Sequence, residues 1–230
     1  MNFKDKLCAM NCHYRFYELE DFFQSVHKLG IQYVELWSGP MHYYVDTHHH
    51  DSLEQLKKLC DRYQITIIGI CPEQTNPKPN NIAVKQAHRR EEVLNYYRQM
   101  IDIACALGCR QVLVTSGWSY YSEAVEEAWN RSIAMMKRIA DYAKQRNVIL
   151  ALEALQPEES RLVNTIQDIQ RYRNEVGSSC LKVCIDFGQW HVWDIHPGNT
   201  SRPSAAILSI FTLWMGIRPV IWPGGMVAVI

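Results

Sequence analysis

Two carboxylates in this sequence directly follow apolar runs, Glu153 after residues 148–152 and Asp186 after residues 181–185. A run that is apolar on both faces is typical of a strand buried in a parallel sheet. Adjacent parallel strands lie about 4.8 Å apart, so carboxylates at two neighbouring strand ends repel each other unless a cation lies between them. The pair therefore predicts part of a divalent-metal site with oxygen ligands. The alternative for each residue is a solvated turn position or a helix cap.

The histidines of this sequence are weaker candidates for metal ligands. His48, His49 and His50 are consecutive, and consecutive side chains cannot all face one ion in a helix or a strand. We expect them to lie in a solvated loop, followed by Asp51 as the N-cap of a helix that starts at Ser52. His13 and His191 flank strand ends and are better placed, although a lone histidine is more often only hydrogen-bonded.

The elements that must position these residues alternate between short apolar strands and amphipathic helices. The predicted strands are rich in apolar and β-branched residues and span 7–10, 33–37, 65–70, 111–115, 148–152 and 181–185. The predicted helices span 18–29, 53–63, 90–107 and 123–146, and a glycine or asparagine ends several of them (Gly30, Gly108, Asn147).

Strict alternation of strand and helix implies parallel strands with right-handed crossovers, so the fold is a barrel or a doubly wound sheet. No glycine-rich phosphate-binding turn follows any of the strands. Polar and aromatic residues stand there instead (Glu35, Trp37, Pro72, Glu73, Ser116, Trp118). Such residues at strand ends form the active face of a barrel, so we predict an α/β fold of the (β/α)8 TIM-barrel type.

Composition narrows the function further. The 24 Lys and Arg residues balance 24 Asp and Glu residues, so the chain lacks the cationic excess that favours nucleic-acid binding. The N-terminal residues form no apolar run, which predicts a cytoplasmic protein, and the eight cysteines are then expected to be reduced and mostly packed in the core. The apolar stretch 205–217 is too short and interrupted to span a membrane.

The last 34 positions differ from the rest of the chain. Arg202 and Arg218 are the only charged residues in 197–230, a segment crowded with Trp, Pro, Gly and Ile. We therefore divide the chain into a partial barrel of about six β/α units (1–196) and an atypical tail (197–230), and expect the barrel to be incomplete.

Five segments together resemble the sugar phosphate isomerase/epimerase superfamily of xylose isomerase-like TIM barrels, in its ketose 3-epimerase and fructoselysine 3-epimerase branch. They are YVELWSGP (33–40), IIGICPEQTN (67–76), HRREEVLNYYRQMIDIACALGCRQVLVTSG (88–117), LALEALQPEES (150–160) and VCIDFGQWH (183–191). The resemblance covers about residues 6–195 and ends near the start of the tail.

The resemblance implies a carbohydrate isomerase that epimerises a ketose or fructosamine-type sugar at C3 through a metal-stabilised enediolate. It implies that Glu153 is a metal ligand and also one of two glutamates that move the proton, that Asp186 is a second ligand, and that Glu159 hydrogen-bonds the sugar. The expected cofactor is a divalent metal, Mn2+ first, with Mg2+, Co2+ or Zn2+ as alternatives. The expected partner is a small sugar, with no nucleic acid or membrane involved, and self-association into a homo-oligomer is an open alternative.

Other residues of the matching segments are expected to contact the substrate. Trp37 and Glu73 follow strand ends, and relatives place a histidine three residues after the aspartate, where this chain has Gln189 and then His191. The family also requires a histidine from the seventh strand and a glutamate from the eighth, and neither can be assigned in this sequence. Permitted codons for residues 206–227, read in a shifted frame, can encode a segment that resembles the family's seventh strand, so we hypothesise a frameshift near Pro197.

Three functions remain open at this point. The chain is a sugar 3-epimerase, a related metal-dependent barrel enzyme such as a dehydratase or an endonuclease IV-like nuclease, or an inactive truncated product. The neutral net charge disfavours the nuclease. The last alternative follows from the exposed strand edges and missing ligands of an incomplete barrel.

Overall fold

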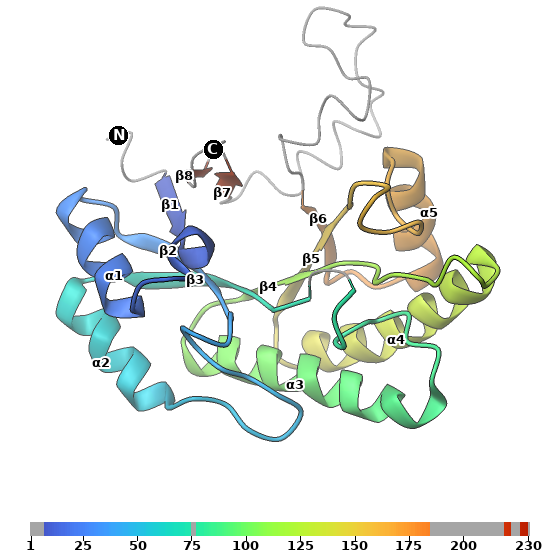
Figure 1. Ribbon diagram of the computed structural model, residues 1–230, viewed down its shortest axis with the longest axis horizontal. Coiled ribbons are helices and arrows are strands. Elements are labelled where there is room, and N and C mark those ends of the chain that lie inside the picture. The colour runs from blue at the N-terminus through green and yellow to red at the C-terminus, as the bar shows by residue number, and fades with distance from the viewer. Residues whose placement is uncertain (1–6, 75–76, 185–218, 222–225, 230) are drawn as a thin grey trace, which may run out of the picture.

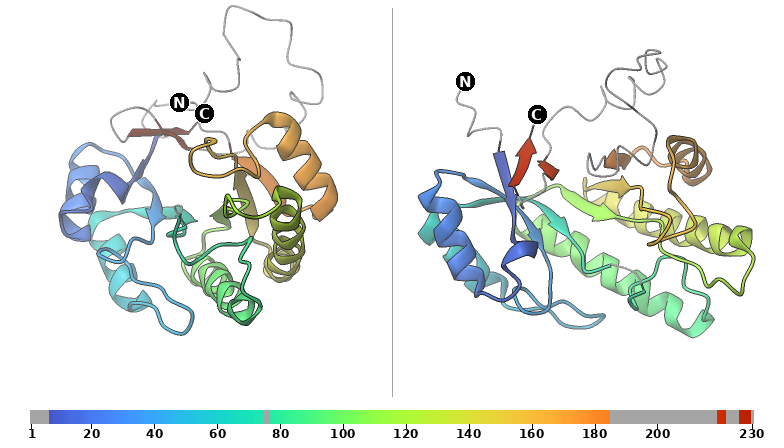
Figure 2. Two further views of the ribbon diagram at one scale, coloured as in Figure 1. Left: turned by 45° about the vertical axis from the view of Figure 1, so that its right-hand side comes forward. Right: turned by 45° about the horizontal axis from the view of Figure 1, so that its top comes forward.

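The structure is a computed structural model that describes residues 7–74 and 77–184 and the backbone of two short strands, 219–221 and 226–229. Its centre is a curved sheet with helices along its outer side (Figures 1 and 2). The strand order is β6-β5-β4-β3-β2-β1-β8-β7.

Six strands run parallel, each paired with its neighbour in the sequence: β1 (Leu7–Met10), β2 (Tyr33–Trp37), β3 (Thr66–Cys71), β4 (Gln111–Val114), β5 (Ile149–Glu153) and β6 (Leu181–Cys184). At the other edge of β1 lies an antiparallel hairpin of β7 (Pro219–Ile221) and β8 (Met226–Val229), with β8 paired to β1. This arrangement is that of a barrel wall built from its first six strands.

Five α-helices connect the parallel strands: α1 (Leu19–Lys28), α2 (Leu53–Tyr63), α3 (Arg90–Ala106), α4 (Val125–Gln145) and α5 (Ile166–Val176). Two short 3-10 helices, η2 (Asn11–Tyr14) and η3 (Ala87–Arg89), lie after β1 and before α3. The helix α5 is absent from the sequence prediction, although Thr165 and Asp168 form a capping box at its start and Gly177 ends it in a left-handed conformation.

Alternation along each strand separates an outer core from an inner face. Val34 and Leu36 of β2 are fully buried against the helices, whereas Tyr33 and Trp37 belong to a separate inner cluster. Because strand side chains alternate between the two faces of a sheet, Glu35 lies on the inner side with Tyr33 and Trp37. The outer core packs the helices on the sheet, and these helices do not cover the inner face, which is where a reactive side chain can contact a ligand.

The predicted strands coincide with the observed ones to within one or two residues at each end, and the four predicted helices do so as well. One local prediction is wrong: Ser52, rather than Asp51, caps α2, because its side chain accepts the hydrogen bond of the Gln55 backbone N–H. The Asp51 carboxylate accepts from the backbone N–H of Tyr44 instead and closes the preceding loop.

Candidate functional site

Glu153 is the last residue of β5 and is half-buried. Its register partner on the next strand is Cys184, so the ends of β5 and β6 lie side by side as the sequence predicts. Ala151, two residues earlier on β5, packs in an inner cluster with Leu113 and Cys184. Alternation therefore directs the Glu153 side chain to the inner face of the sheet.

Cys71 at the end of β3 lies between the two inner clusters. It packs against the cluster that contains Cys184 and also against the cluster that contains Trp37, its register partner on β2. Burial, followed by the nearby carboxylates of Glu35 and Glu153, raises the pKa of the Cys71 thiol well above its usual value. The inner face thus carries two carboxylates in a largely apolar, thiol-lined setting.

Trp37 is fixed at its backbone by the buried side chain of Asn11. The Trp37 N–H donates to Asn11 Oδ1 at 2.7 Å, and Asn11 Nδ2 donates to the Trp37 carbonyl at 2.9 Å and to His42 Nδ1 at 2.8 Å. His42 Nε2 donates to the carbonyls of Tyr14 and Tyr17, which leaves Nδ1 as the acceptor. The loops after β1 and β2 are therefore tied together around Trp37.

The Trp37 ring lies directly on the backbone of Gly39. A Cβ atom on Gly39 would lie 2.2 Å from Trp37 Cζ3, so only glycine allows this approach. The ring also meets the imidazole of His42 edge to face, with centroids 6.1 Å apart. These contacts give the Trp37 ring a defined orientation at the end of β2.

Glu73 follows β3, and its carboxylate pairs with Lys78 of the same loop at 2.7 Å. Its backbone N–H donates to Ser38 Oγ on the β2 side, at 3.2 Å. Next to it, the buried Gln74 donates to the Leu113 carbonyl and accepts from the Thr115 N–H, so the loop after β3 is joined to β4.

Further hydrogen bonds join the loops after β3, β4 and β5. Asn81 donates to the Trp118 carbonyl and accepts from the Trp118 N–H, both at 2.9 Å. Ser160 donates to the Gly117 carbonyl at 2.7 Å, and Arg161 donates to the Tyr120 carbonyl at 2.8 Å. The carboxyl-terminal end of the sheet is therefore rimmed by loops that hold one another in place.

Glu159 lies in the loop after β5 and is exposed. Its carboxylate accepts from the Gln156 backbone N–H at 3.2 Å, and its own N–H donates to the Gln156 carbonyl. In this position Glu159 closes a turn that begins three residues beyond Glu153.

Three predicted site residues lie outside the described residues: Asp186, Gln189 and His191. Within 7–74 and 77–184, no three His, Cys, Asp or Glu side chains gather as a metal-binding group. Of the two predicted metal ligands, the structure therefore describes Glu153, a hard oxygen donor of the type that divalent cations such as Mn2+ and Mg2+ prefer.

The histidine run 48–50 lies in the loop after β2, as expected of a solvated segment. His48 and His49 are exposed, and both backbone N–H groups donate to the Asp46 carboxylate at 2.7 Å. The His50 side chain hydrogen-bonds the Asp51 carbonyl. His13, in η2, is exposed to solvent.

One residue grouped with the strand ends in the sequence is placed differently. Glu35 lies in the middle of β2 and is 4% exposed, with Gln111 Nε2 donating to its Oε1 at 3.4 Å. Cys71 and Cys184 also lie near Glu153, which the sequence analysis did not predict. Their positions at strand ends, read with the two-residue period, could have identified them.

Such a row of parallel strands, each followed by an outer helix and with its polar residues at the carboxyl-terminal ends, defines a TIM-barrel type of α/β protein. The chain matches the family model of the xylose isomerase-like TIM barrel over residues 23–211 and belongs to this family.

Relatives within this family are sugar epimerases. The chain is 28% identical over 164 residues to fructoselysine 3-epimerase of Shigella flexneri, which covers 71% of this chain and 59% of that protein. It is 23% identical over 196 residues to D-psicose 3-epimerase of Agrobacterium fabrum, covering 83% and 65%. The chain thus spans less than two thirds of the length of either relative.

Solved structures share the fold. D-psicose 3-epimerase of Clostridium cellulolyticum H10 aligns with a TM-score of 0.66 at 19% identity over 89% of this chain and 69% of that one. A 3-keto-D-glucoside 4-epimerase from E. coli aligns with a TM-score of 0.70 at 13% identity, over 90% and 76%.

Proposed function

We propose that this chain carries part of the active site of a metal-dependent sugar isomerase, a 3-epimerase of a ketose or fructosamine-type sugar. The observation that carries the proposal is the position of Glu153, at the carboxyl end of β5, on the inner face and beside β6. The names of the relatives, fructoselysine 3-epimerase and D-psicose 3-epimerase, support the substrate class.

Glu153 would have two roles in this proposal, as a ligand of a divalent cation and as a group that moves a proton. Its carboxylate takes or returns the proton on C3 of the sugar, and a second carboxylate on the opposite side of the planar intermediate completes the inversion. The divalent cation held there, Mn2+ before Mg2+, Co2+ or Zn2+, would supply positive charge that stabilises negative charge on the sugar oxygens.

Asp186 is proposed as the second residue that holds this cation. Cys184 is in register with Glu153 and contributes to the inner cluster, and side chains two residues apart on a strand share a face. Asp186 follows Cys184 by two positions in the sequence, which supports this role.

The sugar itself is proposed to contact Trp37, Glu73 and Glu159, with Gln189 and His191 from the segment after β6. Trp37 offers an oriented aromatic face at the end of β2. The carboxylates of Glu73 and Glu159 lie in loops after β3 and β5, beyond the same ends of the strands, where a TIM barrel binds its substrate.

The proposal further places the protein in the cytoplasm, with a small sugar as its partner and with a homo-oligomer as its assembly. No helix in the described part of the chain has the length and apolar character needed to cross a membrane. The equal numbers of acidic and basic residues argue against nucleic acid as a substrate.

A second candidate is a chain that keeps the family fold without its turnover. The antiparallel pairing of β8 with β1 favours it, because a closed barrel of this type has parallel strands throughout. In this view residues 1–196 form the barrel part and residues 197–230 a segment of different character.

Exchange of the C3 hydrogen with solvent distinguishes the two candidates. If the chain is an active epimerase, NMR in D2O with Mn2+ should show deuterium entering C3 of fructose, psicose or fructoselysine. Glu153→Gln should slow this exchange by about 100-fold or more, because a positioned acid or base contributes at least that much. Glu158→Gln, which removes an exposed carboxylate from the same loop, is the matched control and should leave exchange unchanged.

Absence of exchange with all three sugars would instead support the inactive chain. Exchange that is equally fast in Glu153→Gln would remove Glu153 from the proton transfer and contradict the proposal.

A further inference from the structure

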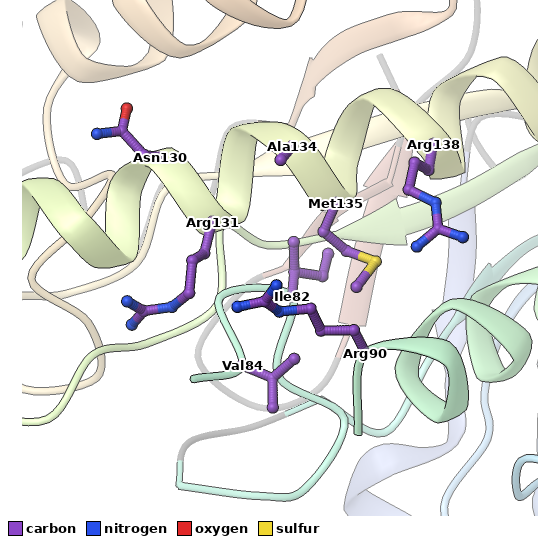
Figure 3. A pocket seen from close by; sticks show the side chains of 8 residues that line it. All are labelled: Ile82, Val84, Arg90, Asn130, Arg131, Ala134, Met135 and Arg138. Carbon is purple, nitrogen blue, oxygen red and sulfur yellow. The ribbon is translucent and has the colours of Figure 1, made fainter. Parts of the chain in front are cut away.

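A pocket of about 330 Å3 lies on the outer side of the sheet, between α3, α4 and the loop that leads into α3. Its size is at the lower end of the range for small-molecule sites. The pocket wall includes three arginines, Arg90 from α3 and Arg131 and Arg138 from α4 (Figure 3). It is separate from the inner face of the sheet, where Glu153 lies.

The floor of this pocket is apolar. Ile82, Val84 and Met135 line it, and they are 1%, 4% and 4% exposed. The pocket therefore presents guanidinium groups around packed hydrocarbon, which suits a ligand with a charged head and a short apolar body.

Two of the three arginines already have carboxylate partners. Arg131 donates to Glu123 at 2.6 Å and to the Ala83 carbonyl at 3.2 Å. Arg138 binds Glu91 through two nitrogens, at 2.7 and 3.0 Å. Both nearby carboxylates are thus engaged and hold the two guanidinium groups at the rim.

Arg90 differs from its two neighbours. Its backbone N–H donates to the Ala87 carbonyl, but within the described residues its side chain forms no hydrogen bond or ion pair. Figure 3 shows its side chain extending from the start of α3 between the side chains of Val84 and Met135, with the guanidinium group drawn beside Ile82. Its five N–H donors are available in a planar fork that matches a carboxylate or a phosphate.

We propose that this pocket binds a small organic anion, a carboxylate or a phosphate monoester, with its oxyanion on Arg90 and its apolar part on Ile82, Val84 and Met135. The oxygens of the anion accept hydrogen bonds from the Arg90 guanidinium. Arg131 and Arg138 add positive charge at the rim while they keep their carboxylate partners. This site is independent of the sugar site proposed above.

Isothermal titration with phenyl phosphate and with benzoate tests the proposal. We expect saturable binding of at least one of them, and whichever binds more tightly assigns the head group. Benzyl alcohol, which has the same ring and no charge, should bind at least tenfold more weakly. Equal binding of benzyl alcohol, or no saturable binding of either anion, would overturn the proposal.

Two variants and one matched control locate the site. Arg90→Gln should weaken binding at least tenfold, whereas Arg89→Gln removes the same charge one residue away, outside the pocket, and should change it less than twofold. Ala134→Leu places a larger side chain from the exposed face of α4 into the pocket and should also abolish binding. Equal losses in Arg89→Gln and Arg90→Gln would show diffuse charge attraction and contradict a site at Arg90.

Discussion

The carboxylate of Glu123 shows how one residue of the loop after β4 is held by its surroundings. Its side chain is 2% exposed, and it accepts from the Tyr120 N–H at 2.9 Å and from Arg131 at 2.6 Å, with Lys85 at 3.6 Å. Burial favours the neutral acid, but the hydrogen bonds and the two cations outweigh it and lower the pKa of Glu123. The charged form is therefore the one that stabilises the fold.

A lowered pKa in the folded state makes this contribution depend on pH. It is fully present above the unfolded-state pKa of about 4.3 and is lost as the pH falls through the folded-state pKa. We expect Glu123→Gln to lower the free energy of unfolding at neutral pH by about 1.5–3 kcal/mol, the range for hydrogen bonds to charged groups. Urea unfolding followed by circular dichroism measures it.

The difference between Glu123→Gln and wild type should shrink in acid, where both side chains are neutral. Glu127→Gln, an exposed position on α4, serves as the control and should change little at any pH. A constant difference from neutral to acid pH would mean that the charge of Glu123 is not what stabilises the loop.

At the scale of elements, side-chain amides join successive loops at the carboxyl-terminal end of the sheet and hold them in fixed positions. Asn11 joins the loops after β1 and β2, Gln74 joins the loop after β3 to β4, and Asn81 joins the loops after β3 and β4. Each uses an amide that both donates and accepts, which satisfies buried backbone groups that no strand or helix pairs.

Gly117 provides a test of how closely these loops fit. It has φ of +76°, and a Cβ atom there would lie 2.3 Å from Asn81 Oδ1; Gly108 has φ of +72° with nothing within 4 Å of such an atom. We expect Gly108→Ala to cost about 1–2 kcal/mol from the left-handed backbone alone. Gly117→Ala should cost about 1–3 kcal/mol more, because Asn81 and the Ala83 backbone N, 2.7 Å from the added atom, must both shift.

Chemical denaturation of the two glycine variants measures both costs against wild type. Equal destabilisation would show that Asn81 and the Ala83 backbone can shift at little cost, so that the loops are loosely packed at this contact.

At the scale of the whole molecule, the main core lies between the parallel strands and the helices. Its described members run from Ala9 on β1 to Val183 on β6. A repeated β/α wall of this kind is stabilised mainly by local packing of each helix on its own strands.

We therefore expect a chain ending at residue 196 to keep the cooperative unfolding of the full chain. Its thermal midpoint should change by less than about 4 °C, which corresponds to about 1 kcal/mol for a protein of this size. Differential scanning calorimetry of both chains measures the change. Loss of the cooperative transition would show that residues 197–230 are part of the core.

Much of the fold could be predicted from the sequence, because β-branched apolar runs and amphipathic helices are local patterns. The strands 7–10 and 33–37 and the helix 53–63 were predicted at their observed bounds. The antiparallel pairing of β8 with β1 was not predicted, because it joins segments more than 200 residues apart. No local pattern specifies such a pairing.

The candidate site divides in the same way. Glu153 was predicted at a strand end and lies there. The family match confirms the TIM-barrel fold, in which the carboxyl ends of the strands carry the active site. The roles of Glu153, Asp186, Glu159, Gln189, His191, Trp37 and Glu73 stay predictions.

The sequence by itself determined the order of strands and helices and the end of the sheet at which polar residues gather, since both follow from residue periodicity. The tertiary structure alone decided which side chains meet: Asn11 with Trp37 and His42, Cys71 between two clusters, and Arg90 over an apolar pocket. The physical reason is that these contacts join residues distant in the sequence, and their geometry depends on how the sheet curves and how the helices pack on it.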